Sequence, residues 1–281
     1  METSCRRCPR ASLGGVSYPS GYAIRGIDLS SIQTVRGHDG RYVDVDWKRV
    51  AASGVRFAYC RCGYGNEAPD GSFAVFAAGA EAAGIAVGAY HVGFPIRIAQ
   101  DPGSSPEEQA RAHFAASHSQ GINPGELPPA LDLEWPVPGT PEWGRHGCTP
   151  EFVRAWTLAY LAEMRALLGG RLPVLYDGFP NYWSAIGGSS EPRFAEYPLW
   201  RVDYRPRPVT PGPWTEFALW QCGGGSGRLP SGAPVDEDVF RGDEAAWRSF
   251  LMLDVTGGGR DEPVYAAPAP DTDRDPGISG A

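Results

Sequence analysis

Short apolar runs alternate with helix-like patterns through the first half of the chain. Four of these runs predict strands, at residues 23–28, 55–62, 85–92 and 127–134. Between them, residues 45–53, 72–83 and 105–121 have the pattern of helices. Gly54 and Gly84 end the first two predicted helices, and the capping box Ser105-Pro106-Glu107-Glu108 begins the third. Strands that alternate with helices in this way predict a parallel sheet built from βα units.

The second half begins with the longest predicted helix and then becomes rich in Gly and Pro. Thr149 and Pro150 begin this helix, and Gly169 ends it. An apolar residue recurs at every fourth position, at Phe152, Trp156, Tyr160, Met164 and Leu168, so we expect this stripe to lie in the core. Four further strands are predicted at 173–176, 198–203, 217–222 and 235–240, with little helical pattern between them.

Eight strands, with helices mainly between the early ones, predict an α/β fold. The expected architecture is one TIM-like eight-stranded barrel in which some late helices are missing or shortened. Residues 1–20 are rich in Arg, Ser, Gly and Pro, and residues 254–281 in Gly, Pro, Ala and Asp. Neither end has a core-forming pattern, so we predict a flexible tail at 1–20, the barrel at 21–253 and a disordered tail at 254–281.

Composition and charge exclude several partners. The formal net charge is −8 and no long Lys/Arg run is present, so we expect no nucleic acid partner. No apolar window approaches the roughly 18 to 20 residues of a membrane span, and the N-terminus lacks the apolar segment of an export signal. Six Cys are sparse for a disulfide framework. Cys5 and Cys8 lack a second metal-binding pair, and Cys60 and Cys62 are expected as buried core thiols.

The first candidates for catalysis are Asp132 and Glu134, which lie two residues apart on a predicted strand. Their side chains would point to the same face, with Cα atoms roughly 6.5 Å apart. Two carboxylates so close raise the pKa of one of them, which gives a proton donor beside an ionised partner. Glycoside hydrolysis needs this division of roles. The alternative for this motif is a solvated strand end.

Other acids are predicted at the same end of the barrel, because functional side chains of such barrels gather at the carboxyl ends of strands. The residues predicted at or near those ends are Asp28, His91, Asp132, Glu134, Tyr176, Asp203 and Asp236. Four acids on one rim, Asp28, Asp132, Glu134 and Asp236, would either stabilise a positive charge that develops on a substrate or hold a metal ion.

Aromatic residues gather around the same strand ends, and sugars present flat apolar faces that pack on such rings. His91 is either a substrate contact or a buried barrel histidine. The predicted substrate-binding residues are Tyr64, Tyr90, His91, Trp135, Tyr176, Trp200, Tyr204 and Trp220.

Several motifs follow one another in order along residues 25–251. They include Gly26-Ile27-Asp28-Leu29-Ser30, Asp46-Trp47-Lys48-Arg49-Val50, Arg61-Cys62-Gly63-Tyr64-Gly65, Gly88-Ala89-Tyr90-His91-Val92, Ala130-Leu131-Asp132-Leu133-Glu134, Leu199-Trp200-Arg201-Val202-Asp203-Tyr204, Leu219-Trp220-Gln221 and Val235-Asp236-Glu237-Asp238-Val239-Phe240. In their order and spacing, the chain resembles the glycoside hydrolase family 25 lysozymes, the Chalaropsis-type muramidases.

The resemblance implies a flattened eight-stranded barrel that cleaves the β-1,4 bond between N-acetylmuramic acid and N-acetylglucosamine. It implies Glu134 as the general acid, with Asp132 assisting and with Asp28 and Asp236 completing the site. No cofactor or metal is expected, the partner would be the glycan strands of peptidoglycan, and the protein would be a monomer. It would act on the cell wall, reached by phage-type release or by effector delivery.

The chain departs from the family pattern in three places. Asp236-Glu237-Asp238 carries an added charge at Glu237, and the segments 35–42 and 136–147 would reshape the groove. Two other functions stay open. One is a metal-dependent hydrolase that uses Asp28, His91, Asp132, Glu134 and Asp236 as ligands. The other is a non-catalytic module that binds the cell wall.

Overall fold

A computed structural model of the chain describes residues 18–36, 42–43, 45–65, 69–96, 105–119, 127–179 and 181–251. Nearly all of both predicted tails, with Cys5 and Cys8, lies outside these residues, so those predictions stay open. Among the helices of the described segments, none combines the length and the apolar character needed to cross a membrane.

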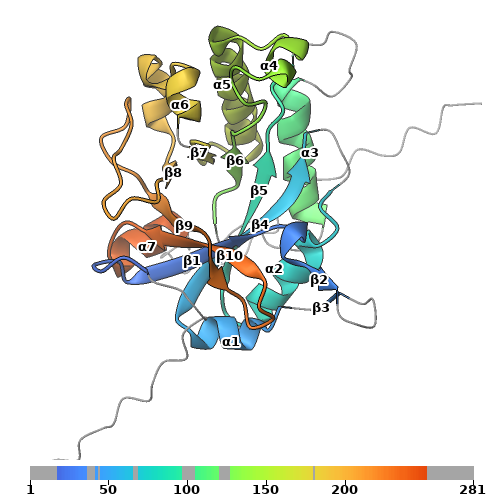
Figure 1. The fold of residues 1–281 in the computed structure, drawn as a ribbon, viewed down its shortest axis with the longest axis vertical. Coiled ribbons are helices and arrows are strands. Elements are labelled where there is room, and N and C mark those ends of the chain that lie inside the picture. Colours follow the sequence, from blue (N-terminus) through green and yellow to red (C-terminus); the bar gives the residue numbers. More distant parts are fainter. Residues whose placement is uncertain are drawn as a thin grey trace, which may run out of the picture.

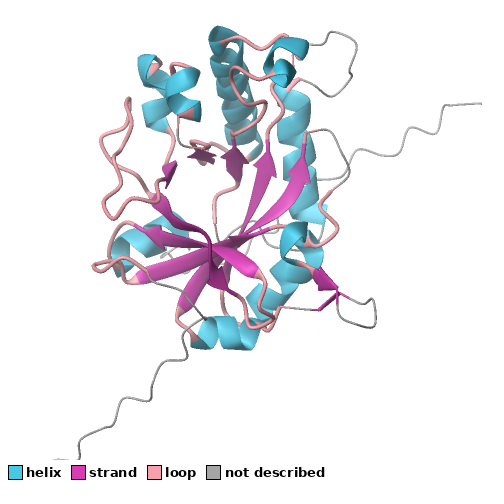
Figure 2. Ribbon diagram, in the orientation of Figure 1, coloured by secondary structure: helices cyan, strands magenta, loops and turns pink. Residues whose placement is uncertain are grey.

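Eight strands form a closed barrel at the centre of the molecule, with helices around it (Figures 1 and 2). The strands are β1 (Ile24–Leu29), β4 (Val55–Tyr64), β5 (Ala86–Val92), β6 (Ala130–Asp132), β7 (Val174–Tyr176), β8 (Leu199–Val202), β9 (Leu219–Arg228) and β10 (Pro234–Phe240). Each predicted strand is present. The prediction of an eight-stranded barrel is therefore confirmed. The apolar runs of the sequence form its strands, and their core-facing side chains are buried.

The strands of the barrel do not all run in one direction. β1 and β4 to β9 pair in parallel, whereas β10 is antiparallel to both of its neighbours, β1 and β9. The first residues of β10 consequently lie at the end of the barrel where the other strands finish, and Asp28 pairs with Asp236 in the register of β1 and β10. Outside the barrel, β2 (Val35–Arg36) and β3 (Tyr42–Val43) form a small hairpin.

Helices follow the early strands as predicted. They are α1 (Trp47–Ala52), α2 (Phe73–Ala82), α3 (Pro106–Ser119) and α5 (Pro150–Leu167). Thr149 caps α5 through its side chain, and Trp156, Tyr160 and Met164 are fully buried beneath it, whereas Phe152 and Leu168 are half-buried. α3 and α5 stand together on one side of the barrel (Figure 1), where Tyr160 contacts His113.

Helices are short or missing between the late strands, as predicted. Among the described residues between β7 and β8, the helical elements are α6 (Tyr182–Ala185) and two 3-10 helices, Gly188–Ser190 and Pro192–Glu196. Residues 203–218, all of them described, connect β8 to β9 without any helix. The sequence pattern missed α4 (Pro141–Arg145) and α7 (Glu244–Leu251), because both helices are too short to show a strong period.

The interior of the barrel is filled by large side chains. Phe57, Tyr59 and Trp200 are buried there, and Trp247 of α7 packs on Phe57 and Phe240 with ring centroids 5.4 and 5.0 Å apart. Trp247 thereby closes the end of the barrel opposite the carboxyl ends of the parallel strands. The outward face of β4 carries Cys60 and Cys62, which are buried against the early helices as expected. At the other end of the barrel, the described residues leave a cavity.

Substitution of Gly26 in β1 tests how tightly the interior of the barrel is packed. A Cβ atom on Gly26 would lie 2.2 Å from the ring of Phe57, which is fully buried and cannot swing away. We therefore expect Gly26→Ala to lower the free energy of unfolding by about 1–3 kcal/mol in urea denaturation, a typical cost of overpacking. Gly71→Ala is the matched control, because nothing lies within 4 Å of the Cβ added there. Equal stability of both variants would contradict this packing.

Candidate active site

The open end of the barrel holds a cavity of about 220 Å³ whose lining includes Asp28, Asp132, Glu134 and Asp236. We call it the acidic pocket. Asp28 lies near the end of β1, Asp132 is the last residue of β6, and Asp236 lies near the start of β10. Asp236 reaches this end only because β10 is antiparallel. The strand-end argument for it was therefore wrong in its reason, although the four acids do gather.

Glu134 lies two residues beyond the end of β6 and not on the strand where it was expected, although it shares the pocket with Asp132 as expected. β6 ends at Asp132, and the backbone N–H of Leu133 donates a weak hydrogen bond to the carbonyl of Tyr176 at 3.4 Å. Leu133 is fully buried, while Glu134 is half-buried. The strand pairing thus ends after Asp132, but the alternation of side chains continues, because Leu133 packs in the core while Asp132 and Glu134 both line the pocket.

Gln221 of β9 connects the polar side chains of the pocket. Its Oε1 accepts hydrogen bonds from the hydroxyls of Tyr176 and Tyr204, each at 3.0 Å. Its Nε2 donates to Oδ2 of Asp28 at 2.7 Å. The two hydroxyl donors fix which end of the amide faces Asp28. Gln221 therefore holds one acid and two rings in fixed relative positions.

Asp238 lies behind Asp28 in the barrel interior and is completely buried. The indole Nε1 of Trp200 donates to its Oδ1 at 2.8 Å, and its carboxyl group shares a hydrogen bond with Asp28. Burial raises the pKa of Asp238 to about 8 against the effect of these hydrogen bonds. It raises the pKa of Asp28 well above its usual range too, with repulsion from Asp238 and Asp236 added. One proton shared by the pair lowers this repulsion.

Arg61 of β4 supplies a positive charge in the lining of the pocket. Its guanidinium donates to Oδ2 of Asp70 and to the hydroxyl of Ser31, both at 2.9 Å. Asp70 also accepts from the backbone N–H groups of Ser31 and Ser72, at 3.1 and 2.9 Å. These bonds fix Arg61 at the rim, where its positive charge opposes the rise that burial causes in the pKa values of Asp132 and Glu134.

Burial of the carboxyl groups is the main electrostatic feature of the pocket. It raises the pKa of Glu134 to about 7, with repulsion from Asp236 added and Arg61 opposing. It raises the pKa of Asp132 as well, with repulsion from Glu134 added. Burial thus shifts both carboxyl groups toward the protonated form relative to the same groups in water. Glu134 is the more exposed of this pair, so its carboxyl group is the better placed to reach a ligand.

Four of the predicted substrate-binding residues line the acidic pocket, namely Tyr90, Tyr176, Trp200 and Tyr204. The lining also includes Phe179 and Ile32, whose side chains are 51% and 74% exposed. Together with Tyr204, which is 51% exposed, they give the rim an apolar surface. Four lining residues were not predicted from the sequence, namely Ile32, Phe179, Arg61 and Gln221, although the last two lie in the motifs quoted above.

His91 and Trp220 do not line the acidic pocket, contrary to expectation. Successive side chains of a strand point to opposite faces, so Tyr90 and Gln221 face the interior while His91 and Trp220 face outward. His91 is 2% exposed and stacks on His113 with ring centroids 5.4 Å apart. Burial lowers its pKa to about 4, which keeps the imidazole neutral. Of the two roles considered for His91, the structure therefore supports that of a buried barrel histidine.

Tyr64, Trp135 and Asp203 also lie outside the described lining of the pocket. Tyr64 and Trp135 both pack on Phe94, with ring centroids 4.0 and 4.2 Å away. Asp203 accepts from Arg201 and Arg205 and from the backbone N–H of Val209, at 3.4, 2.8 and 3.0 Å respectively. Asp203 directly follows the last residue of β8, as predicted, but its carboxylate orders the loop after β8 and does not line the pocket.

The described residues contain no group of three or more His, Cys, Asp or Glu side chains arranged to hold a metal ion. His91 is separated from the acids because it faces the other side of β5. The ligand set that the metal hypothesis needed is therefore not assembled in this part of the chain.

Comparisons with known proteins agree on one family. The sequence profile of the family described as glycosyl hydrolases family 25 matches residues 27–226. Lysozyme M1 of Streptomyces globisporus is 26% identical over 226 residues, which are 79% of this chain and 69% of that protein. The solved structure of a bacterial lysozyme from Streptomyces coelicolor has a TM-score of 0.66 at 26% identity, covering 82% of this chain and 98% of that one. A muramidase from Acremonium alcalophilum gives 0.62 at 27% identity, covering 81% and 98%.

The raised pKa of Glu134 has a consequence for stability. A carboxyl group whose pKa rises from 4.5 to about 7 on folding favours the folded state at low pH, and this contribution is lost as the pH rises through 7. Glu134→Gln removes the cost of ionising the buried group. We therefore expect the variant to exceed the wild type in free energy of unfolding by on the order of 2 kcal/mol at pH 8, and to match it at pH 4.

Urea denaturation at both pH values measures this difference. Glu196→Gln is the matched control, since the side chain of Glu196 is 60% exposed, and it should show no such pH dependence. The same difference in free energy of unfolding between Glu134→Gln and the wild type at pH 4 and pH 8 would contradict the raised pKa of Glu134.

Proposed function

The chain belongs to glycosyl hydrolases family 25, and on this basis we propose that it is a peptidoglycan muramidase that uses Glu134 as its general acid. The substrate bond would be the β-1,4 bond between N-acetylmuramic acid and N-acetylglucosamine. The observation that carries the proposal is the gathering of four acids in one pocket, with Glu134 half-buried at its surface, where burial raises the pKa of this carboxyl group to about 7.

Glu134 would donate its proton to the glycosidic oxygen as the bond from that oxygen to the sugar C1 breaks. A general acid works best when its pKa lies near the working pH, because it then stays protonated and still releases its proton readily. Its partial exposure supports this role, since the proton must reach a substrate in the pocket. Water finally adds its hydroxyl to C1, and its remaining proton restores the acid.

Asp132 would assist this step, either by orienting the N-acetyl group of the substrate or by stabilising the positive charge that develops on the sugar ring. Preformed negative charges in a partly closed pocket stabilise such a state better than water does, because they need no reorganisation. Gln221 would keep Asp28 in place during the reaction through the hydrogen bond of 2.7 Å. Asp236, fixed by the backbone N–H of Gly225, would complete the acidic set.

The glycan strand would lie across the exposed side chains of the rim. Tyr204, Phe179 and Ile32 offer apolar surface to the faces of the sugar rings, and Arg61 offers hydrogen-bond donors. The comparison proteins are described as lysozymes and muramidases, which supports a glycan of this class as the partner.

Digestion of purified cell walls tests which bond is cleaved. We expect mass spectrometry of the soluble products to show muropeptides with reducing N-acetylmuramic acid ends. Reducing N-acetylglucosamine ends would indicate the other glycosidic bond, and freed stem peptides would indicate an amidase. A chelator such as EDTA should leave the rate unchanged. Binding to walls without new reducing ends would favour a non-catalytic module.

Substitution of the acid tests the mechanism. Glu134→Gln should lower the rate of wall clearing by about 10²- to 10⁴-fold, the usual contribution of a general acid. The circular dichroism spectrum should stay unchanged, because the substitution keeps the size of the side chain. Glu196→Gln should clear walls at the wild-type rate. Clearing at a similar rate by folded Glu134→Gln would contradict the role of Glu134.

A further inference from the structure

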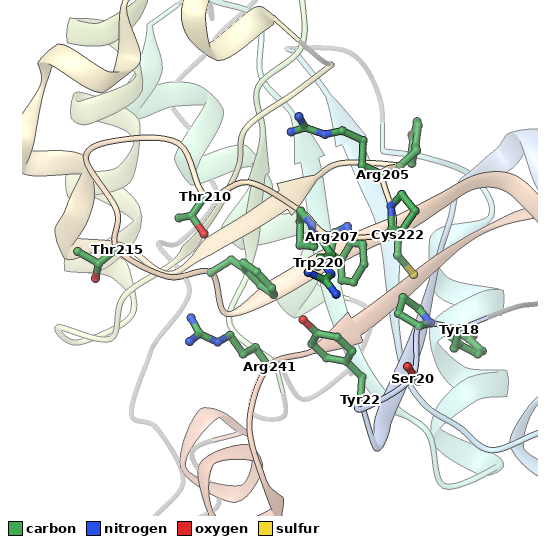
Figure 3. Close-up of a pocket in the computed structure, with 15 residues that line it drawn as sticks. Tyr18, Ser20, Tyr22, Arg205, Arg207, Thr210, Thr215, Trp220, Cys222 and Arg241 are labelled. Atoms are coloured by element: carbon green, nitrogen blue, oxygen red, sulfur yellow. The ribbon is translucent and has the colours of Figure 1, made fainter.

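A second and larger hollow lies on the outer wall of the barrel, beside the acidic pocket. Its volume is about 890 Å³, roughly the size of a site for a peptide or drug-sized ligand. We call it the outer groove and define it by Tyr22, Arg205, Arg207, Trp220 and Arg241 (Figure 3). Tyr22 lies before β1 and Arg241 after β10. Arg205 and Arg207 lie in the loop after β8, and Trp220 lies on β9.

The groove exists because a helix is missing. In a barrel of alternating strands and helices, a helix between β8 and β9 would cover the outward side chains of β9. Here residues 203–218 form a loop, and Trp220 and Cys222 of β9 face the groove. Asp203 orders that loop through Arg205 and Val209, and the indole of Trp220 donates to the carbonyl of Asp203 at 2.6 Å. The wall of the groove is therefore held by specific bonds.

The charge of the groove is opposite to that of the whole chain. The chain has a net charge of −8, yet the described lining contains three arginines and neither Asp nor Glu. Arg205 is bound to Asp203, and Arg241 pairs with Glu216 at 3.1 Å while both side chains remain well exposed. Arg207 has no ion-pair partner among the residues that the structure describes. Exposed pairs exchange easily, so Arg207 and Arg241 are available to a ligand.

The groove continues from the acidic pocket at Tyr204, which lines both. The hydroxyl of Tyr204 bonds Gln221 inside the pocket, and its exposed ring borders the groove. A substituent on a sugar in the pocket would pass over this ring into the groove. If that substituent carried carboxylates, the acids of the pocket would repel it and the arginines of the groove would attract it.

We propose that the outer groove binds the acidic stem peptide attached to the lactyl group of N-acetylmuramic acid. This proposal rests on the muramidase function. Guanidinium groups bind carboxylates through paired hydrogen bonds, and the half-buried ring of Tyr22, which packs on the buried Trp220, offers surface to the apolar parts of a peptide. The enzyme would then prefer glycan strands that still carry peptides, and it would read the peptide through Arg207 and Arg241.

The test compares two substrates and two variants. The substrates are soluble, uncrosslinked glycan strands with their stem peptides, and the same strands after an amidase has removed the peptides. For Arg207→Gln/Arg241→Gln, kcat/KM on the peptide-bearing strands should fall about tenfold, mainly through a higher KM, as expected from the loss of charge-assisted hydrogen bonds. On peptide-free strands the double variant should equal the wild type.

Arg248→Gln is the control for loss of a surface charge, because the side chain of Arg248 is 67% exposed and lies outside the groove. It should behave as the wild type on both substrates. Equal losses of the double variant on both substrates, or no loss on either, would overturn the proposal. So would a loss seen only on whole walls and abolished by extraction of their phosphate polymers, which would assign the groove to those polymers.

Calorimetric titration with the free stem pentapeptide examines the groove without turnover. Wild-type protein should bind the peptide, and the double variant should bind about tenfold more weakly. If the wild type cleaved neither substrate but bound the peptide in this way, the muramidase proposal would fail and the groove assignment would stand. Absence of peptide binding to wild-type protein, with muramidase activity intact, would refute the groove assignment alone.

Discussion

The structure depends on the burial of several carboxyl groups at one end of a closed barrel. Removing a carboxylate from water is costly unless it gains hydrogen bonds, a nearby positive charge or a proton. The barrel uses all three. Gln221 bonds Asp28, Trp200 bonds Asp238, Arg61 lies near Asp132 and Glu134, and the pKa values of the acids rise. The same burial that lowers stability at high pH therefore supplies a proton donor near neutral pH.

The antiparallel direction of β10 accounts for the composition of this site. A parallel eighth strand would carry its first residues to the opposite end of the barrel, where Trp247 closes the interior. Because β10 runs the other way, Asp236 and Asp238 come from the start and middle of the strand to meet Asp28 of β1. The direct hairpin between β9 and β10 leaves no helix there, and the segment before β9 is a loop that lines the outer groove instead of a helix. The acidic pocket and the outer groove thus have related origins.

Tyr204 joins the two regions. Its hydroxyl belongs to the network of Gln221, Tyr176 and Asp28, while its ring borders a surface on which arginines replace acids. A glycan bound in the pocket and a peptide bound in the groove would meet at this ring. Because the two regions have opposite charges, the acidic pocket would bind the neutral sugars and the outer groove would bind the acidic peptide. The protein would then contact two different parts of one polymer.

The sequence by itself determined the barrel, the placement of its strands and three of the acids at one end, Asp28, Asp132 and Glu134, because apolar runs must be buried and strand ends carry the polar residues between them. It could not decide on which face of a strand a given side chain lies. Tyr90 and His91 are both plausible ligands by type, as are Trp220 and Gln221, but only the closed sheet fixes that Tyr90 and Gln221 point inward. Nor could it show that Glu134 lies beyond its strand, or that β10 is antiparallel. Those features depend on contacts between segments far apart in the chain, and only the tertiary structure brings these segments together.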